Sequence, residues 1–343
     1  MNSYERVMTS LDFREPDRVP IAEFLIDKRV YTALMPEAGE QYDFDVKFGF
    51  DVLATKAWYG TVREQGDTFV DEWGITYTRN KEAVAHPVQS AFEDTAGLKN
   101  FVVPDPDLPE RLAALPKMVK NHKGERVIGF ALRAMFLWAA NLVGLDNLLV
   151  YMLTEPGFVH DLLDRIVEAQ TRLARNALAA GADMIVDTDD YAFNNGPLMS
   201  PELFDLFITP RLKKFAAAVH GEGGYFLKHT DGNIMKIMDS FIAAGIDGIQ
   251  SIDPIAGMDM GEMKARYGKK ISLWGNIDCG NLLANGSREE VRAAVRDCIR
   301  AGASGGGFVL MSSNSIPYSA KPENYLALLE AAGEYGRYGD IPC

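Results

Sequence analysis

The sequence has few cysteines, no long apolar run and no excess of positive charge. Its 343 residues include three cysteines, an odd number spread over a long chain, which is not typical of a secreted disulfide framework. No stretch reaches the roughly 18 uncharged apolar residues that a membrane-spanning helix needs. The first residues contain no apolar segment of a secretory signal. We therefore expect a cytoplasmic protein with reduced thiols and no membrane partner.

Positive charge is also scarce. The chain carries 35 Lys and Arg against 48 Asp and Glu, a formal net charge of −13 at pH 7. Such a charge repels the phosphate backbone of nucleic acids, so the sequence argues against a nucleic-acid partner. What the chain does have is a hydrophobic fraction of 47%, which is ample for a folded core.

The order of apolar and amphipathic segments predicts the fold. From about residue 120 onward, short apolar runs alternate with helical stretches, which is typical of repeated βα units around a parallel sheet. Strands are expected at residues 18–24, 51–56, 127–132, 184–188, 224–228, 248–252, 271–275 and 307–311. Eight parallel strands can close into a barrel, which leaves no exposed edge. The predicted fold class is therefore α/β, a TIM (β/α)8 barrel.

We expect residues 1–343 to form a single barrel domain, with residues 1–16 and 60–120 partly forming extensions to it. Residues 68–79 alternate apolar and polar side chains around Trp73-Gly74, which predicts a β-hairpin on the rim of the barrel. Ser287 and Glu290 have the spacing of a capping box and predict the start of a helix.

Polar residues cluster where the predicted strands end. In a TIM barrel the interior is packed, so chemistry falls to residues at the C-terminal ends of the strands. Those that we expect to be catalytic are Asp187, Asp190, His229 and Asp278, and those that we expect to bind the substrate are Glu23, Trp58, Arg133, Asn276 and Asn314. Carboxylates that converge on one opening repel one another and need a cation or shared protons.

His229 is the expected centre of this acidic site. It directly follows an apolar strand, and an imidazole can bind a metal through one nitrogen or move a proton near neutral pH. A metal site could consist of His229, Asp231 and Cys279. Alternatives remain open at this point, because an aspartate after a strand can cap the next helix, the imidazole can be held by backbone groups, and Cys279 can be an unused loop thiol.

Several segments carry a resemblance to a known family. They are Arg14-Glu15-Pro16-Asp17-Arg18-Val19-Pro20, Ser200-Pro201-Glu202-Leu203-Phe204, His229-Thr230-Asp231-Gly232 and Trp274-Gly275-Asn276-Ile277-Asp278. With these segments the chain resembles the uroporphyrinogen decarboxylase superfamily over nearly its whole length. The resemblance implies a TIM barrel, possible homodimers and one of two chemistries.

The first chemistry is decarboxylation of uroporphyrinogen. True decarboxylases of the superfamily carry an arginine-rich N-terminal stretch that grips the carboxylates of the porphyrinogen. Here the matching region reads Ile21-Ala22-Glu23-Phe24, and a glutamate in that place argues against a polyanionic substrate.

The second chemistry passes a methyl group between a small methylated compound and the cobalt of a corrinoid protein. Thiol-methylating members bind zinc through His-x-Cys after the fifth strand and a further cysteine after the eighth. His229 matches the histidine, whereas Asp231 replaces the first cysteine and Asn314 falls near the second. Carboxylates make a harder centre, suited to polarising an ether oxygen.

The resemblance therefore implies a corrinoid-dependent methyltransferase of the O-demethylase type. Its substrate would be a methoxyaromatic compound, its corrinoid would be carried by a partner protein, and a zinc ion or Asp190 would activate the leaving oxygen. Trp58 and Tyr59 could hold the aromatic ring. Two other interpretations remain: a metal-free decarboxylase or lyase that acts on a smaller substrate, and a corrinoid-binding barrel without enzymatic activity.

Overall fold

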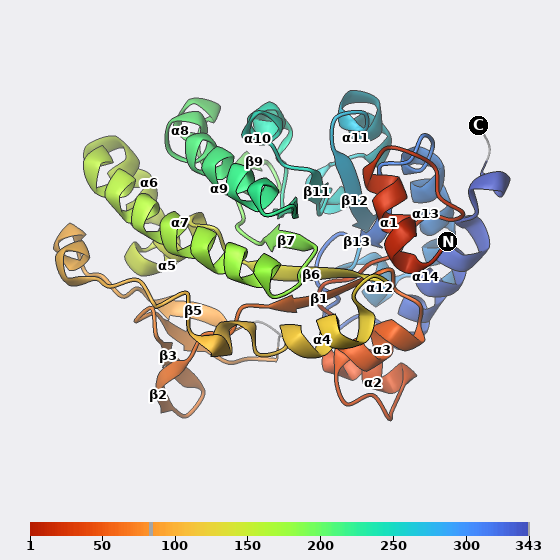
Figure 1. Ribbon diagram of the computed structural model, residues 1–343, viewed down its shortest axis with the longest axis horizontal. Coiled ribbons are helices and arrows are strands. Elements are labelled where there is room, and N and C mark those ends of the chain that lie inside the picture. Colours follow the sequence, from red (N-terminus) through yellow and green to blue (C-terminus); the bar gives the residue numbers. More distant parts are fainter. Residues whose placement is uncertain (82–84, 342–343) are drawn as a thin grey trace.

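The central sheet of the protein consists of seven parallel strands. A computed structural model describes residues 1–81 and 85–341 (Figure 1). In spatial order the strands are β1 (Val52–Lys56), β6 (Val127–Leu132), β7 (Met184–Asp187), β10 (Tyr225–His229), β11 (Gly248–Gln250), β12 (Ser272–Ile277) and β13 (Phe308–Ser312). Every neighbouring pair is parallel, as repeated βα units require.

Residues 20–22 complete the ring between β13 and β1. The amide of Leu310 donates to the carbonyl of Pro20 (2.9 Å), and the amide of Ala22 donates to the carbonyl of Leu310 (3.1 Å). On the other side, the amide of Asp51 donates to the carbonyl of Ile21 (2.8 Å). These bonds close the sheet, so the prediction of a TIM barrel is confirmed.

The prediction of a regular strand at residues 18–24 is wrong in detail, because this segment forms only isolated bridges, at Arg18 and Ile21. Pro20 has no amide hydrogen to give to a ladder. The amide of Ile21 donates to the Asp51 carboxylate (2.8 Å) and not to a neighbouring backbone carbonyl.

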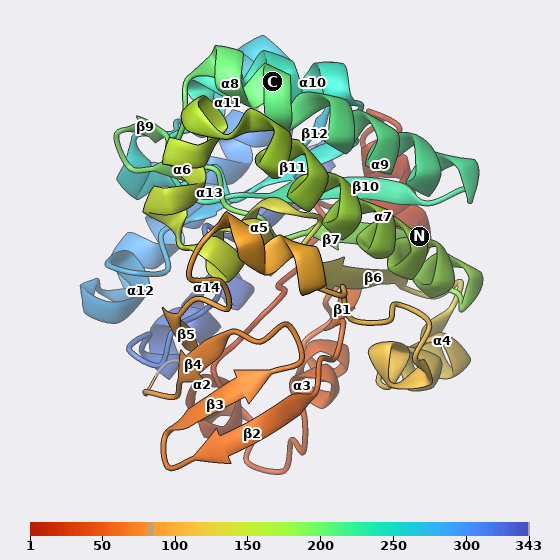
Figure 2. The same cartoon turned by 90° about the vertical axis from the view of Figure 1, so that its left-hand side faces the viewer.

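Helices surround this sheet (Figures 1 and 2). They are α1 (Ser3–Leu11), α2 (Lys28–Leu34), α3 (Gln41–Lys47), α4 (Leu115–His122), α5 (Phe136–Val143), α6 (Leu145–Thr154), α7 (Pro156–Ala179), α8 (Pro201–Phe207), α9 (Thr209–Gly221), α10 (Met238–Ala244), α11 (Met260–Tyr267), α12 (Leu282–Asn285), α13 (Arg288–Gly302) and α14 (Pro322–Tyr335). Five short 3-10 turns are also described: Thr95–Asn100, Pro109–Leu112, Met235–Ile237, Pro254–Ala256 and Tyr338–Asp340. The capping box of Ser287 and Glu290 is present at the start of α13, as predicted.

Among the described residues, no single helix combines the length and the apolar composition that crossing a bilayer would take. The pair α5 and α6 would pass that test together, but the two helices meet at a bend of 99°.

An antiparallel sheet lies beside the barrel (Figure 2). It consists of β2 (Thr61–Gln65), β3 (Thr68–Asp71), β4 (Thr76–Thr78) and β5 (His86–Gln89), and a separate two-residue hairpin joins β8 (Ala192–Phe193) to β9 (Gly196–Pro197). The hairpin of β3 and β4 confirms the prediction for residues 68–79, and β2 and β5 widen it into a sheet. Trp73, in the turn between β3 and β4, stacks on Trp138 of α5 with ring centroids 4.2 Å apart, which attaches this rim sheet to the barrel.

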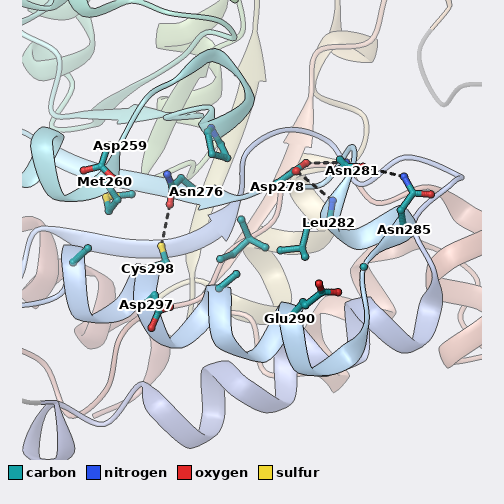
Figure 3. A pocket seen from close by; sticks show the side chains of 15 residues that line it. Asp259, Met260, Asn276, Asp278, Asn281, Leu282, Asn285, Glu290, Asp297 and Cys298 are labelled. Carbon is teal, nitrogen blue, oxygen red and sulfur yellow. Dashed lines mark hydrogen bonds between the residues drawn. The ribbon is translucent and has the colours of Figure 1, made fainter.

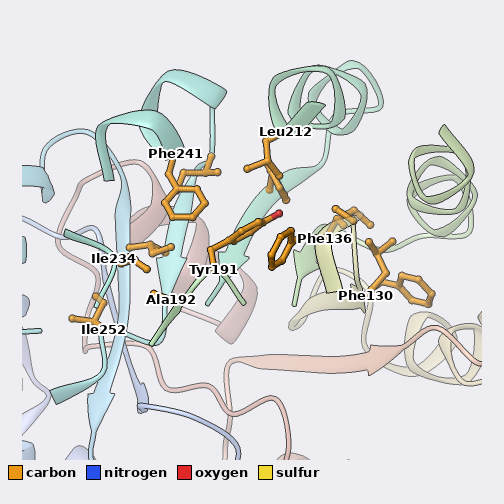
Figure 4. Packing of buried hydrophobic residues seen from close by; sticks show 14 of the residues in the cluster. Phe130, Phe136, Tyr191, Ala192, Leu212, Ile234, Phe241 and Ile252 are labelled. Carbon is orange, nitrogen blue, oxygen red and sulfur yellow. The ribbon is translucent and has the colours of Figure 1, made fainter. Parts of the chain in front are cut away.

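Two hydrophobic clusters fill the protein. One lies inside the barrel and takes alternate residues from neighbouring strands, including Ala22, Val52, Val127, Val186, Leu227, Trp274 and Val309. The other lies between the sheet and the helices, where Phe136, Tyr191 and Phe241 pack together (Figure 4). This alternation decides which residues at the strand ends face the barrel opening, here called the mouth. Lys56, His229 and Gln250 continue the inner rows of β1, β10 and β11.

The Asp51 carboxylate is predicted to be essential for closure of the barrel. It is fully buried and contacts Arg6 (2.6 Å) and Arg18 (2.9 Å) in addition to the amide of Ile21. Because Asp51→Ala leaves two arginines without this partner, we expect a loss of about 3 to 5 kcal/mol in the free energy of unfolding, measured with urea. Asp12→Ala, which breaks only the exposed contact with Arg14, should cost no more than about 1 kcal/mol. Equal losses in the two variants would contradict this role.

Candidate active site

Three of the predicted site residues come together at the mouth. Asp190 follows β7, His229 ends β10, and Asp231 lies two residues further along. The His229 Nε2 atom is 3.6 Å from one oxygen of Asp190 and 3.6 Å from one oxygen of Asp231. One ligand atom from each residue lies within 4.8 Å of the other two, and all three side chains are partly buried. We call these residues the His229 group.

Gln250 fixes the orientation of the imidazole. Its amide nitrogen donates to the carbonyl of Ser312 (3.2 Å), and its amide oxygen contacts His229 Nδ1. A backbone carbonyl can only accept, so the nitrogen of the Gln250 amide must face Ser312 and its oxygen must face the ring. Nδ1 then carries the proton, and the lone pair of Nε2 points toward the two carboxylates.

The sequence analysis missed Gln250. The available signal was a polar residue at an inward position of an otherwise apolar strand.

Asp231 has one oxygen that is satisfied and one that is not. Its Oδ2 accepts from the side-chain amide of Asn314, whereas its Oδ1 is buried and has no hydrogen-bond partner. Burial raises the pKa of Asp231, and the nearby His229 opposes that rise. The backbone amide of Asp231 donates to Asp190 Oδ1 (3.0 Å), but the Nε2 lone pair and the two carboxylates still face one another, and their combined negative charge favours a bound cation or proton. Asn314, expected to bind the substrate, thus supports the His229 group.

Asp187 lies in the barrel wall and not in the mouth. It is paired by register with Lys228, and both side chains point to the outer side of the sheet, where they form a fully buried ion pair of 3.0 Å. Burial raises the pKa of Asp187, while the Lys228 ammonium acts in the opposite direction. Strand alternation therefore removes Asp187 from the place that a catalytic residue needs.

Lys228 itself joins the two segments that carry the site. Its ammonium donates to the backbone carbonyls of Asp189 (2.6 Å) and His229 (2.6 Å). The Asp189 carboxylate accepts from the first amides of α5, those of Met135 (2.7 Å) and Phe136 (2.7 Å) among them. The loop that carries Asp190 is therefore held on both sides.

Glu23 also points away from the mouth. Glu23 is 3% exposed, and the titratable groups near it include Asp45 of α3 and the neutral phenol of Tyr325 in α14. Burial raises the pKa of Glu23 to about 8, while the backbone amide of Ser312 donates to it (3.3 Å). The structure therefore places this expected substrate-binding residue behind the barrel wall.

Asn276 and Asp278 lie apart from the His229 group. The amide oxygen of Asn276 accepts from the thiol of Cys298 in α13 (3.2 Å), and Asp278 accepts from the amides of Gly280 (2.9 Å) and Asn281 (2.8 Å). Both residues line a cavity of about 650 Å³ between β12 and helices α11, α12 and α13 (Figure 3). This cavity contains none of the His229 group, whose chemistry therefore defines the candidate site better than the cavity does.

Cys279 is not a member of the His229 group. Its thiol is 6% exposed and lies 3.7 Å from the hydroxyl of Ser313. Burial raises the pKa of the Cys279 thiol to about 12, so the thiolate that a metal would bind is disfavoured. Within residues 1–81 and 85–341, the cluster suited to a metal contains Asp190 in the position that the sequence analysis gave to Cys279.

Trp58 and Arg133 lie on the side of the barrel formed by β1 and β6. The ring of Trp58 is 50% exposed, and the guanidinium of Arg133 lies over the ring of Trp138 at 5.3 Å. Tyr59, which we expected to hold the aromatic ring of the substrate, makes structural contacts. Its hydroxyl donates to Gln170 (3.0 Å) and its ring packs on Trp138, so it belongs to the contact between the barrel and the rim sheet.

These features define a class of protein: a TIM barrel with an acidic, histidine-centred group at the C-terminal ends of its strands. Residues 73–335 match the family described as uroporphyrinogen decarboxylase (URO-D), and the chain belongs to this family. A solved methyltransferase from Methanosarcina mazei has the same fold, with a TM-score of 0.78 over 98% of this chain and 99% of that one, at 20% sequence identity.

The relatives include two kinds of enzyme. The chain is 28% identical to a methylcobamide:CoM methyltransferase of Methanosarcina barkeri over 57% of its own length and 55% of the relative. It is 24% identical to a methylated-thiol–coenzyme M methyltransferase of Methanosarcina mazei, over 68% of its length and 61% of the relative. It is 24% identical to a uroporphyrinogen decarboxylase of Idiomarina loihiensis, over 70% and 68%. The chain thus spans little more than half of the first of these relatives.

The buried Glu23 carboxyl predicts a pH-dependent stability. Its pKa is raised in the folded protein, so its contribution to stability is fully present below the ordinary pKa of a glutamate and is lost as the pH rises through about 8. Between about pH 5 and about pH 9, the wild-type protein should lose a few kcal/mol of unfolding free energy relative to Glu23→Gln. Urea unfolding at both pH values measures the difference. The exposed Glu168→Gln should show no such divergence, and parallel curves for Glu23→Gln would refute the prediction.

Proposed function

We propose that the protein transfers a methyl group from a small methylated compound to a corrinoid carried by a partner protein. The observation that carries this proposal is the His229 group, in which an imidazole lone pair and two carboxylates face one another and one buried oxygen has no partner. The methyltransferases among the relatives support the reaction class. The substrate that we infer is a methoxyaromatic compound.

The donor set fits a zinc ion. Tetrahedral zinc binds nitrogen and oxygen ligands at about 2.0 to 2.2 Å, which separates neighbouring ligand atoms by about 3.3 Å. The 3.6 Å between Nε2 and each carboxylate oxygen is close to that separation. Asp190, His229 and Asp231 would hold the ion, and three protein ligands leave a fourth position for a substrate atom. When bound, zinc supplies a positive charge that stabilises a leaving oxygen.

The leaving group explains why such a site is useful. In O-demethylation the bond between the methyl carbon and the ether oxygen breaks, the methyl group passes to the reduced corrinoid, and the electron pair stays on the oxygen. An expelled phenoxide needs a proton or a cation to neutralise it. The His229 group would hold the cation that neutralises the leaving oxygen. Gln250 would keep the imidazole lone pair directed at this cation, and Asn314 would hold the Asp231 carboxylate in place.

Removal of the imidazole should abolish both zinc binding and methyl transfer. We expect purified wild-type protein to contain close to one zinc ion per chain and to demethylate a methoxyaromatic compound in the presence of a reduced corrinoid protein, because three protein ligands make a catalytic zinc site. His229→Ala should lose the metal and the activity, measured by elemental analysis and by release of the phenol. His86→Ala, at an exposed position on β5, is the matched control and should retain both.

The same experiment decides against the alternative chemistry. Uroporphyrinogen decarboxylases also occur among the relatives, so a metal-free decarboxylase or lyase is the second candidate. Turnover that is undiminished after chelation would refute the zinc-dependent mechanism and favour that candidate, whereas unchanged zinc content in His229→Ala would refute the role of His229 as a zinc ligand.

We expect Gln250 to increase the affinity for zinc without being a zinc ligand. In Gln250→Leu the imidazole loses the acceptor that keeps the proton on Nδ1, so we expect zinc affinity to fall by about 10 to 100-fold with little change in thermal stability. Competition with a zinc-binding dye measures the affinity. Gln250→Glu keeps an acceptor at the ring and should bind zinc better than Gln250→Leu does. Equal affinities in wild type and Gln250→Leu would show that Gln250 has no orienting role.

A further inference from the structure

Two cationic side chains lie at the ends of β1 and β6, on the part of the mouth next to the acidic residues that follow β7 and β10. Val52 belongs to the cluster inside the barrel, and Lys56, four residues later on β1, continues the same inward row. Lys56 is paired by register with Ala131 of β6, and Arg133 follows two residues after Ala131. Both cations therefore lie at the C-terminal end of the barrel, as His229 does.

Lys56 and Arg133 are close enough to influence each other. Burial and the Arg133 guanidinium both lower the pKa of the Lys56 amine, although the Lys56 side chain remains exposed to solvent. The face of Trp138 holds the guanidinium from one side. Two like charges held side by side are unfavourable unless an anion lies between or beside them.

Neither cation has a carboxylate partner. In the part of the chain that the structure describes, the ion pairs include neither Lys56 nor Arg133, and neither side chain makes a hydrogen bond. Arg111, a neighbouring arginine of the rim, shows the usual alternative, since Glu72 neutralises it. In a protein with a net charge of −13, two adjacent unpaired cations at the mouth point to an anionic ligand.

We propose that Lys56 and Arg133 bind the carboxylate of an anionic methoxyaromatic substrate, whose methoxy oxygen lies at the His229 group. This inference rests on the proposed function and specifies its substrate class. Arginine binds a carboxylate through two parallel N–H groups, and lysine adds a point charge.

The separation of the two charged regions suits such a molecule. β6, β7 and β10 are consecutive in the sheet, and neighbouring strands are about 4.8 Å apart, so the ends of β6 and β10 lie about 10 Å apart. An aromatic ring with a carboxylate and a methoxy group at opposite ends has a length that fits this gap once the side chains reach inward. Asp190 and Asp231 repel the carboxylate, so the same charges also set the direction in which the substrate enters.

Calorimetric titration with four probes tests the proposal: 4-methoxybenzoate, benzoate, methoxybenzene and inorganic phosphate. We expect the wild-type protein to bind the two carboxylates, with methoxybenzene at least about tenfold weaker. Lys56→Gln and Arg133→Gln should each weaken benzoate binding about tenfold or more, and Arg133→Lys should recover part of the loss. Lys269→Gln, at an exposed lysine outside the mouth, is the matched control and should bind like wild type.

Benzoate separates this inference from the proposed function, because it carries no methyl group and its binding can be measured on protein stripped of metal. If the His229→Ala experiment fails while benzoate binding still depends on Lys56 and Arg133, the anion site stands without the zinc mechanism. Unchanged affinity for 4-methoxybenzoate in both glutamine variants, or phosphate bound as tightly as benzoate, overturns the proposal even if methyl transfer is demonstrated.

Discussion

The arrangement at the mouth depends on one buried ammonium group, that of Lys228. It lies in the outer layer of the barrel wall, paired with Asp187, and reaches the backbone carbonyls of both Asp189 and His229. A buried charge is tolerated only where such partners surround it, so its position is strongly constrained. Because those carbonyls belong to β10 and to the loop after β7, the same contacts fix His229 relative to Asp190. The candidate site is thus positioned by charges that never face the solvent.

The charges that do face the mouth are segregated. Lys56 and Arg133 follow β1 and β6, whereas Asp190, His229 and Asp231 follow β7 and β10. The protein has an excess of carboxylates, and Glu72 neutralises the nearby Arg111. No carboxylate of the described residues forms such an ion pair with Lys56 or Arg133. Segregation instead creates a gradient across the opening, which favours ligands that carry an anionic end and an uncharged donor end.

The sequence allowed the barrel to be predicted from the order of apolar runs, and the polar residues just after them included all three members of the His229 group, although Cys279 was expected in the metal set and Asp190 only as a catalytic residue. The errors concern strand phase. Side chains alternate between the two faces of a strand, so one position decides whether a carboxylate lies in the mouth or in the wall. The side chains of Asp187 and Glu23 point to the outer face of the sheet, whereas that of His229 points to the inner face. Gln250 was missed although its polar side chain in an apolar strand was a signal, and Lys56 was given no role, because the contacts of both depend on register with neighbouring strands, which a sequence alone does not specify.

The chemistry of the ligands separates this chain from a thiolate-based site. Cys279 is the one cysteine near the mouth that the sequence offered as a ligand, and burial next to Ser313 raises the pKa of its thiol to about 12. Carboxylates, by contrast, are ionised at neutral pH unless burial prevents it, and the imidazole beside Asp231 opposes the effect of burial. A harder donor set favours an oxygen leaving group over a thiol. On this reasoning Asp231 in place of a cysteine ligand, together with the nearby Asp190, would change the substrate of the barrel and leave its architecture intact.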